Sequence, residues 1–244
     1  MAERIPGWDE MQYASLRACG VTCDCRPGRI VALCEQGKDE WFRLRKGRVT
    51  ASKVGAVVGI KGERSQSATC DSFKWALVAE RLTGTLPDTH VTAAMQYGTD
   101  TEPQAREWYV ARYQPVREVG FIWHDATTHD MGASPDGLCA DRGLEIKCPT
   151  AAVACKTLYR ISTKKRPADG IDAAHRLQMQ FAMWCSGIPR WDYLLYSDPI
   201  RNIPCLVVTV EADAKLHDAF DRILPEFNAE VAEAVESIRG EDAI

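Results

Sequence analysis

The sequence has no long hydrophobic run and no apolar segment near its start. Its longest apolar stretches, at residues 54–60 and 206–210, are far shorter than the roughly 20 residues that a membrane-spanning helix needs. An export signal is not expected, because Glu3, Asp9 and Glu10 occupy the start of the chain and no apolar segment follows them. These absences argue against a membrane partner, and we expect a protein of the cytoplasm.

Internal repeats, low-complexity segments and dividing linkers rich in Pro or Gly are lacking as well. The 244 residues are 45% apolar and 26% charged, which is the composition of a globular protein. A single domain of this length buries roughly 70–75% of the surface that its unfolded chain exposes, so its core needs neither a disulfide nor a metal. One domain is therefore the expected organisation.

The chain has ten cysteines but lacks the paired spacing of a zinc knuckle. In a cytoplasmic protein such thiols stay reduced. Cys19, Cys23, Cys25 and Cys34 could begin a structural zinc site, but we favour free thiols because their spacing is not that of the usual ligand pairs. The other six are interpreted as small core residues: Cys70, Cys139, Cys148, Cys155, Cys185 and Cys205.

An excess of positive charge, which would favour a nucleic-acid partner, is also lacking. The chain has 30 Lys and Arg against 34 Asp and Glu, a formal net charge of −4. The charge is unevenly distributed, however: residues 43–53 and 156–166 each hold five basic side chains and no acid, and residues 211–244 hold ten acids against three basic side chains. Each basic cluster is either a nucleic-acid contact or a solvated face, and the charge pattern alone leaves both open.

Hydrophobic periodicity predicts an α/β fold in which helices flank a central mixed β-sheet. Helical patterns cover residues 71–82, 99–113 and 173–186, and a short helix is predicted from the hydroxyl residues at 50–52 to Val58. A long amphipathic helix follows the last strand, with Pro225 as a candidate bend and an apolar face that ends at Ile238. Strands are predicted at residues 119–124, 131–133, 143–148, 191–197 and 204–210.

A turn followed by a strand carries the most informative charged residues. Ser134-Pro135-Asp136-Gly137 has turn chemistry, because Pro fixes φ and Gly permits a positive φ, so Asp136 should lie at the head of a hairpin. Side chains at i and i+2 of a strand share a face, so Glu145 and Lys147 should project together. Two carboxylates beside a lysine suit Mg²⁺ or Mn²⁺, with the lysine orienting a water near a phosphate. A solvent-facing Glu–Lys pair is the alternative.

Polar residues elsewhere fit the same chemistry. Arg45, Thr50 and Ser52 lie beside the start of the short predicted helix, whose free N–H groups and dipole would favour an anion such as phosphate. Two amides on the helix at 173–186 and two further carboxylates complete the set: Gln178, Gln180, Glu102 and Asp125.

Several motifs occur in order along the chain: Cys34-Glu35-Gln36-Gly37 leading into Trp41, Leu44-Arg45-x-Gly47-x-x-Thr50-Ala51-Ser52, Ser134-Pro135-Asp136-Gly137-Leu138-Cys139, Leu144-Glu145-Ile146-Lys147-Cys148-Pro149, Gln178-x-Gln180-Phe181-x-Met183-Trp184 and a segment at 219–227. Together they resemble the phage lambda exonuclease and YqaJ-like viral recombinase family, within the PD-(D/E)xK nuclease superfamily. The resemblance runs from about residue 29 to residue 231 and does not explain the cysteine-containing start. We therefore expect an extension over residues 1–28 and one exonuclease domain over residues 29–244.

The resemblance implies a restriction-endonuclease-like core and a metal-dependent site. Asp136, Glu145 and the backbone carbonyl of Ile146 would hold a divalent metal, namely Mg²⁺ with Mn²⁺ as a substitute. Lys147 would activate the attacking water, and Glu102 would lie at the far side of the metal.

The same resemblance implies substrate contacts. Gln178 would help to position the attacking water or the scissile phosphate, and Asp125 is a candidate for a second-metal or outer position. The family's pocket for the terminal 5′-phosphate and the DNA corresponds here to Arg45, Ser52, Thr50 and Lys53.

Such a protein would degrade the 5′-ended strand of linear double-stranded DNA and leave a 3′ single strand for an annealing protein, as in phage-type recombination. The family further implies a homotrimeric ring, whose low-dielectric channel, lined by the basic clusters, would focus positive potential inward. A phage or prophage would encode it, and it would act in the bacterial cytoplasm. The alternatives are an endonuclease on the same core, which would cut closed circular DNA, and a non-catalytic zinc or DNA-binding module, which would hold zinc on the N-terminal cysteines.

Overall fold

The computed structural model describes residues 23–26, 29–86, 91–124, 130–197 and 202–240, with only the backbone course given up to residue 30. Within these ranges no helix is both long and apolar enough to cross a membrane. The helices are α2 (Asp39–Arg45), α3 (Ala68–Thr83), α4 (Ala93–Val110), α5 (Ala151–Ser162), α6 (Ala173–Ser186) and α7 (Ala214–Gly240), with 3₁₀ turns η1 (Val54–Ala56) and η2 (Pro167–Gly170). The strands are β1 (Cys23–Arg26), β2 (Arg29–Ala32), β3 (Val49–Thr50), β4 (Phe121–Trp123), β5 (Met131–Ala133), β6 (Gly137–Leu138), β7 (Gly143–Lys147), β8 (Arg190–Leu195) and β9 (Leu206–Glu211).

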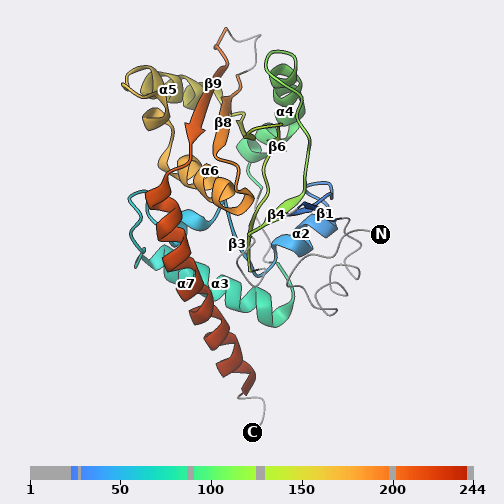
Figure 1. The fold of residues 1–244 in the computed structure, drawn as a ribbon, viewed down its shortest axis with the longest axis vertical. Helices are drawn as coiled ribbons and strands as arrows, with labels where there is room; N and C mark the ends of the chain where they lie inside the picture. The colour runs from blue at the N-terminus through green and yellow to red at the C-terminus, as the bar shows by residue number, and fades with distance from the viewer. Residues whose placement is uncertain (1–22, 27–28, 87–90, 125–129, 198–201, 241–244) are drawn as a thin grey trace.

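The strands form two mixed sheets flanked by helices (Figure 1). One has the order β1-β2-β4-β5-β3 and the other the order β6-β7-β8-β9. The prediction of mixed pairing is confirmed in both sheets, since β3–β5 and β7–β8 are parallel and the other pairs are antiparallel. The division into two sheets falls between β5 and β6, where Pro135 has no N–H to continue a ladder.

Strand register decides which side chains of β7 share a face. Glu145 lies opposite Tyr193 of β8, and Lys147 lies opposite Leu195. This face continues into the large core that contains α6 and α7. The alternate residues Leu144 and Ile146 are buried against α4 in a second core cluster. The predicted alternation along residues 143–147 is confirmed, and it puts both charged side chains on the α6 side of the sheet.

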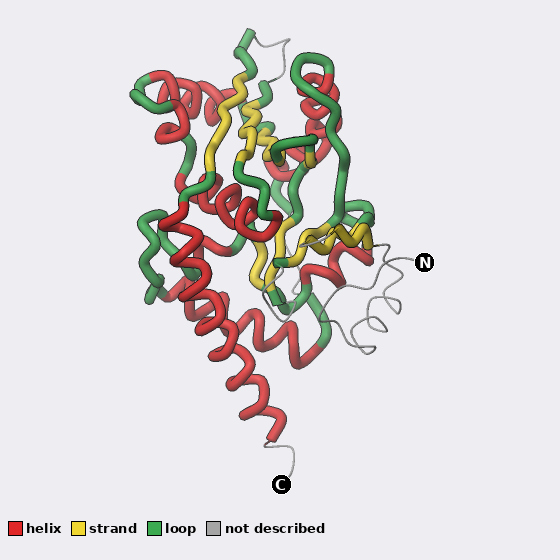
Figure 2. Tube along the Cα trace, in the orientation of Figure 1, coloured by secondary structure: helices red, strands yellow, loops and turns green. Residues whose placement is uncertain are grey.

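The helix α6 occupies the centre of the molecule and contacts β4, β5, β8, η1 and α7 (Figure 2). Its predicted bounds are confirmed. Asp172 caps its N-terminus by accepting a hydrogen bond from Ala174 N at 3.0 Å, and Gly187 ends it with φ 67°. The segment in between is almost wholly buried, so α6 is a rigid support for polar side chains near its start.

Other helix boundaries differ from the prediction. Helix α4 begins at Ala93 rather than near residue 99, because the Thr92 hydroxyl accepts a hydrogen bond from Met95 N and caps it. Helix α7 continues through Pro225, and its apolar face is buried from Leu216 to Val235, whereas Ile238 is 42% exposed. The structure also contains two helices that we did not predict, α2 and α5.

The short helix predicted from residue 50 to Val58 is wrong at its start. Thr50 is buried and extended in β3, where it pairs with Gly132 of β5. Only the 3₁₀ turn η1 follows, and no side chain caps it. The parallel pairing of β3 with β5, which joins Thr50 to Gly132, therefore overrides the helix-capping tendency of the hydroxyl residues at 50–52.

The seven cysteines with described side chains are free thiols, as expected. Cys70, Cys148 and Cys185 are buried, and Cys139 and Cys205 are partly buried. Cys155 is exposed on the outer face of α5, so the prediction that it is a core residue is wrong. The cysteines at 19, 23 and 25 lie outside the described side chains.

Candidate active site

The hairpin of β6 and β7 places Asp136 beside β7. Gly137 pairs with Leu144 and Leu138 with Gly143, so the residue before β6 lies alongside the middle of β7. Asp136 Oδ2 accepts a hydrogen bond from Ile146 N at 2.6 Å. Burial raises the pKa of Asp136, although Lys147, the Ile146 N–H and Arg106 act in the opposite direction.

Glu145 and Lys147 form an ion pair in the same place. Lys147 Nζ lies 2.5 Å from Glu145 Oε1, and the Glu145 side chain is almost completely buried. Burial raises the pKa of Glu145 to about 7, against the attraction of Lys147 and with the help of Asp136. Burial lowers the pKa of Lys147, but the two carboxylates raise it by more, so Lys147 stays charged.

Glu102 approaches from α4 on the other side of the hairpin. Burial raises its pKa to about 7, repulsion from Asp136 adds to this, and Arg106 and Lys147 oppose it. The structure thus brings three of the predicted carboxylates and the predicted lysine into one electrostatically coupled group.

The donor chemistry of this group suits a hard cation. Within the described ranges, no three His, Cys, Asp or Glu side chains are arranged so that they alone could hold a metal ion. Mg²⁺, however, binds through one or two carboxylates and keeps several waters. Asp136 and Glu145, with the Ile146 carbonyl, match that smaller set. Their raised pKa values mean that negative charge is disfavoured there, and a divalent cation would relieve this.

Two residues near Lys147 were not found from the sequence. Tyr193 is buried opposite Glu145, and its hydroxyl lies 3.3 Å from His175 Nδ1 on α6. Burial, reinforced by Lys147, lowers the pKa of His175 to about 4, so the ring is neutral at pH 7. Gln178 is partly buried on α6, three residues after His175. Asp125, the weaker candidate, lies outside the described residues.

The residues predicted to bind a terminal phosphate surround Arg45. Its Nη1 donates to Ser134 Oγ at 3.1 Å and its Nη2 to Ser52 Oγ at 3.2 Å. Thr50 Oγ1 lies 3.5 Å from Ser52 Oγ. Burial lowers the pKa of Arg45 to about 10, opposed by Glu80, so it remains a cation at neutral pH. The predicted residue Lys53 is exposed beside this pocket.

The pocket differs from the prediction in how it is built. It does not lie at the N-terminus of a helix, because Thr50 belongs to β3. The positive charge of Arg45 and the hydroxyls supply the anion-binding character instead. The pocket includes Ser134, which sequence reasoning used only as part of a turn, and the Trp41 ring, whose centroid lies 4.4 Å from Arg45 Cζ.

The Arg45 pocket and the carboxylate group share one short segment of chain. Ser134 Oγ accepts from Trp41 Nε1 at 2.9 Å, and the Pro135 carbonyl accepts from Gln36 Nε2 at 2.7 Å. Asp136 is the next residue. Anchoring of Ser134 and Pro135 by side chains around α2 therefore also fixes the position of the Asp136 backbone.

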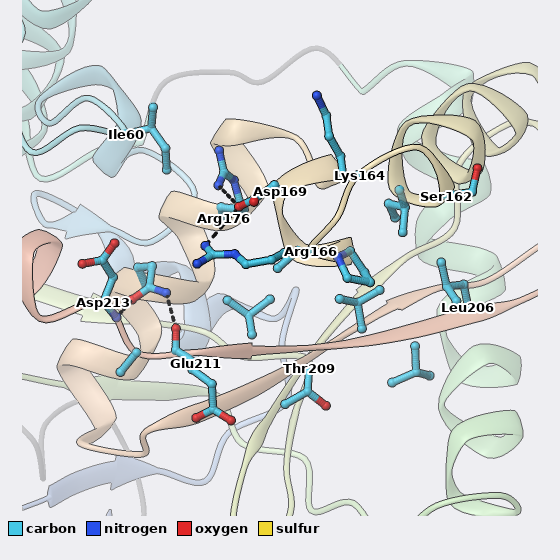
Figure 3. A pocket seen from close by; sticks show the side chains of 18 of the residues that line it. Ile60, Ser162, Lys164, Arg166, Asp169, Arg176, Leu206, Thr209, Glu211 and Asp213 are labelled. Carbon is cyan, nitrogen blue, oxygen red and sulfur yellow. Dashed lines mark hydrogen bonds and ion pairs between the residues drawn. The ribbon is translucent and has the colours of Figure 1, made fainter.

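Two residues of the second basic cluster, Lys164 and Arg166, line a separate cavity. This cavity, of about 1170 Å³, runs between β9 and the segment formed by α5 and η2 (Figure 3). Lys164 and Arg166 line one wall, and Glu211 and Asp213 line the other. None of Asp136, Glu145 and Lys147 lines it, so it is not the catalytic pocket.

The fold and the carboxylate–lysine group define a nuclease core of the PD-(D/E)xK type. The model of the YqaJ-like viral recombinase domain matches residues 40–189, and the chain belongs to this family. The family predicted from the motifs is thereby confirmed. Comparison with curated protein sequences gives no match.

Solved structures support this assignment. The crystal structure of an alkaline exonuclease from Laribacter hongkongensis, LHK-Exo, has a TM-score of 0.72 and 32% identity, covering 84% of this chain and 98% of that one. The structure of LHK-Exo in complex with dAMP gives the same values. A phage-related exonuclease from Haemophilus somnus 129PT is 14% identical with a TM-score of 0.59, covering 78% of this chain and 96% of that one, and it supports the fold alone.

Proposed function

We propose that the protein is a Mg²⁺-dependent DNA exonuclease that degrades the 5′-ended strand of linear duplex DNA and leaves a 3′ single strand. The observation that carries this proposal is the connection between the Arg45 pocket and Asp136 through two residues. A pocket that holds a terminal phosphate beside a hydrolytic centre favours cleavage at a 5′ end. The similar structure LHK-Exo is described as an alkaline exonuclease, which supports the same reaction class.

The roles follow from the positions of the side chains. Asp136, Glu145 and the Ile146 carbonyl would hold Mg²⁺, which supplies charge stabilisation and lowers the pKa of a water. The Lys147 ammonium would orient that water toward phosphorus, and Gln178 would contact the water or the phosphate. Attack breaks the bond from phosphorus to the 3′-oxygen of the terminal nucleotide, which takes up a proton. Each cut leaves a new 5′-phosphate on the shortened strand, so the Arg45 pocket would be refilled after every step.

One experiment tests the reaction and its direction. The protein is incubated with linear and closed circular duplex DNA, with Mg²⁺ or EDTA, and with either the 5′ or the 3′ end of one strand labelled. We expect loss of linear DNA only, only with Mg²⁺, and early release of the 5′ label as a mononucleotide. Lys147→Ala should lower the rate by at least about 100-fold. Cutting of the circle would indicate an endonuclease instead, and stoichiometric zinc without DNA loss would indicate a binding module.

The Arg45 pocket has its own test. Arg45→Ala should reduce the ratio of cleavage rates on 5′-phosphorylated and 5′-hydroxyl ends by about 10-fold or more, because a charge-assisted hydrogen bond to the phosphate is lost. Arg43→Ala is the matched control, since Arg43 is exposed on the same helix. An unchanged ratio in Arg45→Ala would show that the pocket does not bind the terminal phosphate.

The assembly is also part of this proposal. A homotrimeric ring around the DNA, working with a single-strand annealing protein in the cytoplasm of a bacterial host, would keep the enzyme on its substrate. Native mass spectrometry of the full chain should give three times 27.2 kDa. A monomer at micromolar concentration would contradict the ring.

A further inference from the structure

Arg106 lies on α4 one turn after Glu102, and its side chain is only 15% exposed. All three guanidinium nitrogens have partners. Nη2 lies 2.6 Å from Glu102 Oε1, Nε donates to the Asp136 carbonyl at 3.1 Å, and Nη1 lies 3.1 Å from Glu118 Oε2. No motif or predicted role included this residue.

The three partners come from three segments that only the folded chain brings together. Glu102 belongs to α4, Asp136 precedes β6, and Glu118 precedes β4. Two of the partners, Glu102 and Asp136, are parts of the proposed metal site. The third, Glu118, is 70% exposed, and an ion pair that is so open to water contributes little to stability.

Two carboxylates that face the same cation, such as Glu102 and Asp136, repel each other when both are ionised. A guanidinium that touches the Glu102 carboxylate and the Asp136 backbone offsets that repulsion and fixes their separation. The planar fork of arginine can make these contacts in different directions at once, whereas a lysine ammonium is a point charge on a flexible stem.

We propose that Arg106 is a positioning residue that holds Glu102 and Asp136 at the separation needed for both to face one divalent cation. The proposal rests on the metal site of the proposed function. The competing interpretation is an ordinary i,i+4 ion pair that stabilises α4 slightly and has no effect on metal binding.

Calcium binding without DNA separates the two interpretations, because it does not depend on cleavage. Isothermal titration calorimetry with CaCl₂ on the full chain should show at least about 10-fold weaker binding for Arg106→Lys than for the wild type. The Mg²⁺ concentration for half-maximal cleavage should rise in parallel. Arg112→Lys is the matched control, since Arg112 lies just after the same helix and its guanidinium contacts Trp108, through the Trp108 carbonyl at 3.3 Å and the Trp108 ring at 4.5 Å.

A double-mutant cycle tests whether Arg106 acts through Glu102. If it does, Glu102→Gln and Arg106→Lys together should weaken Ca²⁺ binding by much less than the product of the two single effects. Arg106→Gln is a second variant, and thermal melting monitors the fold of each protein. Unchanged Ca²⁺ affinity in Arg106→Lys, or multiplicative effects in the cycle, would overturn the positioning role while leaving the nuclease proposal intact. A wild type that binds no Ca²⁺ would overturn the metal site and this proposal together, whereas binding of Ca²⁺ without DNA cleavage would overturn the nuclease proposal alone.

Discussion

Gln178 and Gln180 are two residues apart on α6, yet their side chains have different surroundings. Gln180 is 4% exposed, and its amide joins two other segments by donating to the Glu211 carbonyl at 2.8 Å and accepting from Asp213 N at 2.8 Å. It therefore fixes the connection from β9 to α7. Gln178 is more open than Gln180 and follows His175 by three residues, so the two share a face of the helix.

Substitution of these two amides should have opposite effects. Gln180→Ala removes two partly buried hydrogen bonds, each worth about 0.5–1.5 kcal/mol, so it should cost about 1–3 kcal/mol of stability while the folded protein still cleaves DNA. Gln178→Ala should lower kcat by about 10-fold or more with an almost unchanged melting temperature. Thermal melting and single-turnover cleavage of the same preparations check both. Loss of stability in Gln178→Ala with normal cleavage would reverse the assignment.

The candidate catalytic residues that could be placed together from the sequence are those whose geometry is local in sequence. Asp136, Glu145 and Lys147 lie on one hairpin, so turn chemistry and strand alternation were enough to place them together. The roles of Ser134, Tyr193 and Arg106 could not be predicted. Ser134 meets Arg45 across 89 residues, and Tyr193 meets Glu145 only because β7 and β8 pair in parallel. No local pattern contains such contacts.

Helices and strands, too, were predicted correctly where the sequence pattern depends on neighbouring residues. Helix α6 has a cap and a terminating glycine at its ends, and its bounds were predicted correctly. The 50–58 segment failed because β3 pairs with β5 at long range. Helix α5 went unpredicted; Ala154 and Ile161 are its buried residues, whereas Val153 and Tyr159 are 51% and 71% exposed, so apolar side chains also lie on its solvent face.

His124, at the end of β4, joins the first sheet to α6. Its ring stacks on Trp184 with centroids 3.4 Å apart, and Trp184 Nε1 donates to Asp221 of α7 at 2.9 Å. Burial lowers the pKa of His124 to about 4; the neighbouring His217 acts in the same direction and Asp221 opposes both. His124 therefore binds a proton near pH 4 in the folded protein, whereas it binds one near pH 6.5 in the unfolded chain.

The stability of the protein should therefore fall as the pH falls from about 6.5 to about 4, because the unfolded state then binds more protons than the folded state. His124→Phe keeps an aromatic ring against Trp184 but removes the titration. Its melting temperature should depend less on pH in this window than that of the wild type, measured by calorimetry at pH 7 and pH 5 with pH 8 as the reference. Identical pH profiles would exclude His124 as a source of acid sensitivity.

Across the whole molecule, charge is separated by position. The basic cluster at residues 156–166 covers the second half of α5 and the segment after it, whereas the acidic helix α7 extends to the opposite end of the molecule (Figure 1). A net charge of −4 therefore does not describe the surface that DNA would meet. Local cations decide the affinity for phosphates, and the distant acids matter less at physiological salt, where charges are screened beyond about 8 Å.

Binding to duplex DNA should accordingly depend strongly on salt. Replacing Lys156, Lys164 and Arg166 with Ala should reduce the slope of log K against log salt by about 0.9 for each lost phosphate contact. Lys215→Ala, an exposed position at the start of α7, is the control. Measurement by fluorescence anisotropy in EDTA separates binding from cleavage. Equal slopes for the triple variant and the wild type would place the DNA elsewhere.

The parallel pairing of β7 with β8 has a consequence for the order in which activity can arise during synthesis. The chain leaves β7 after Lys147, passes through α5, η2 and α6, and returns only at Arg190. Loops of this length close slowly, and strands that are distant in sequence pair late in folding. A nascent chain that ends before β8 therefore has all of the proposed catalytic side chains but lacks the strand that supports Glu145 and Lys147. Hydrolytic competence should appear abruptly, once nearly the whole polypeptide has been made.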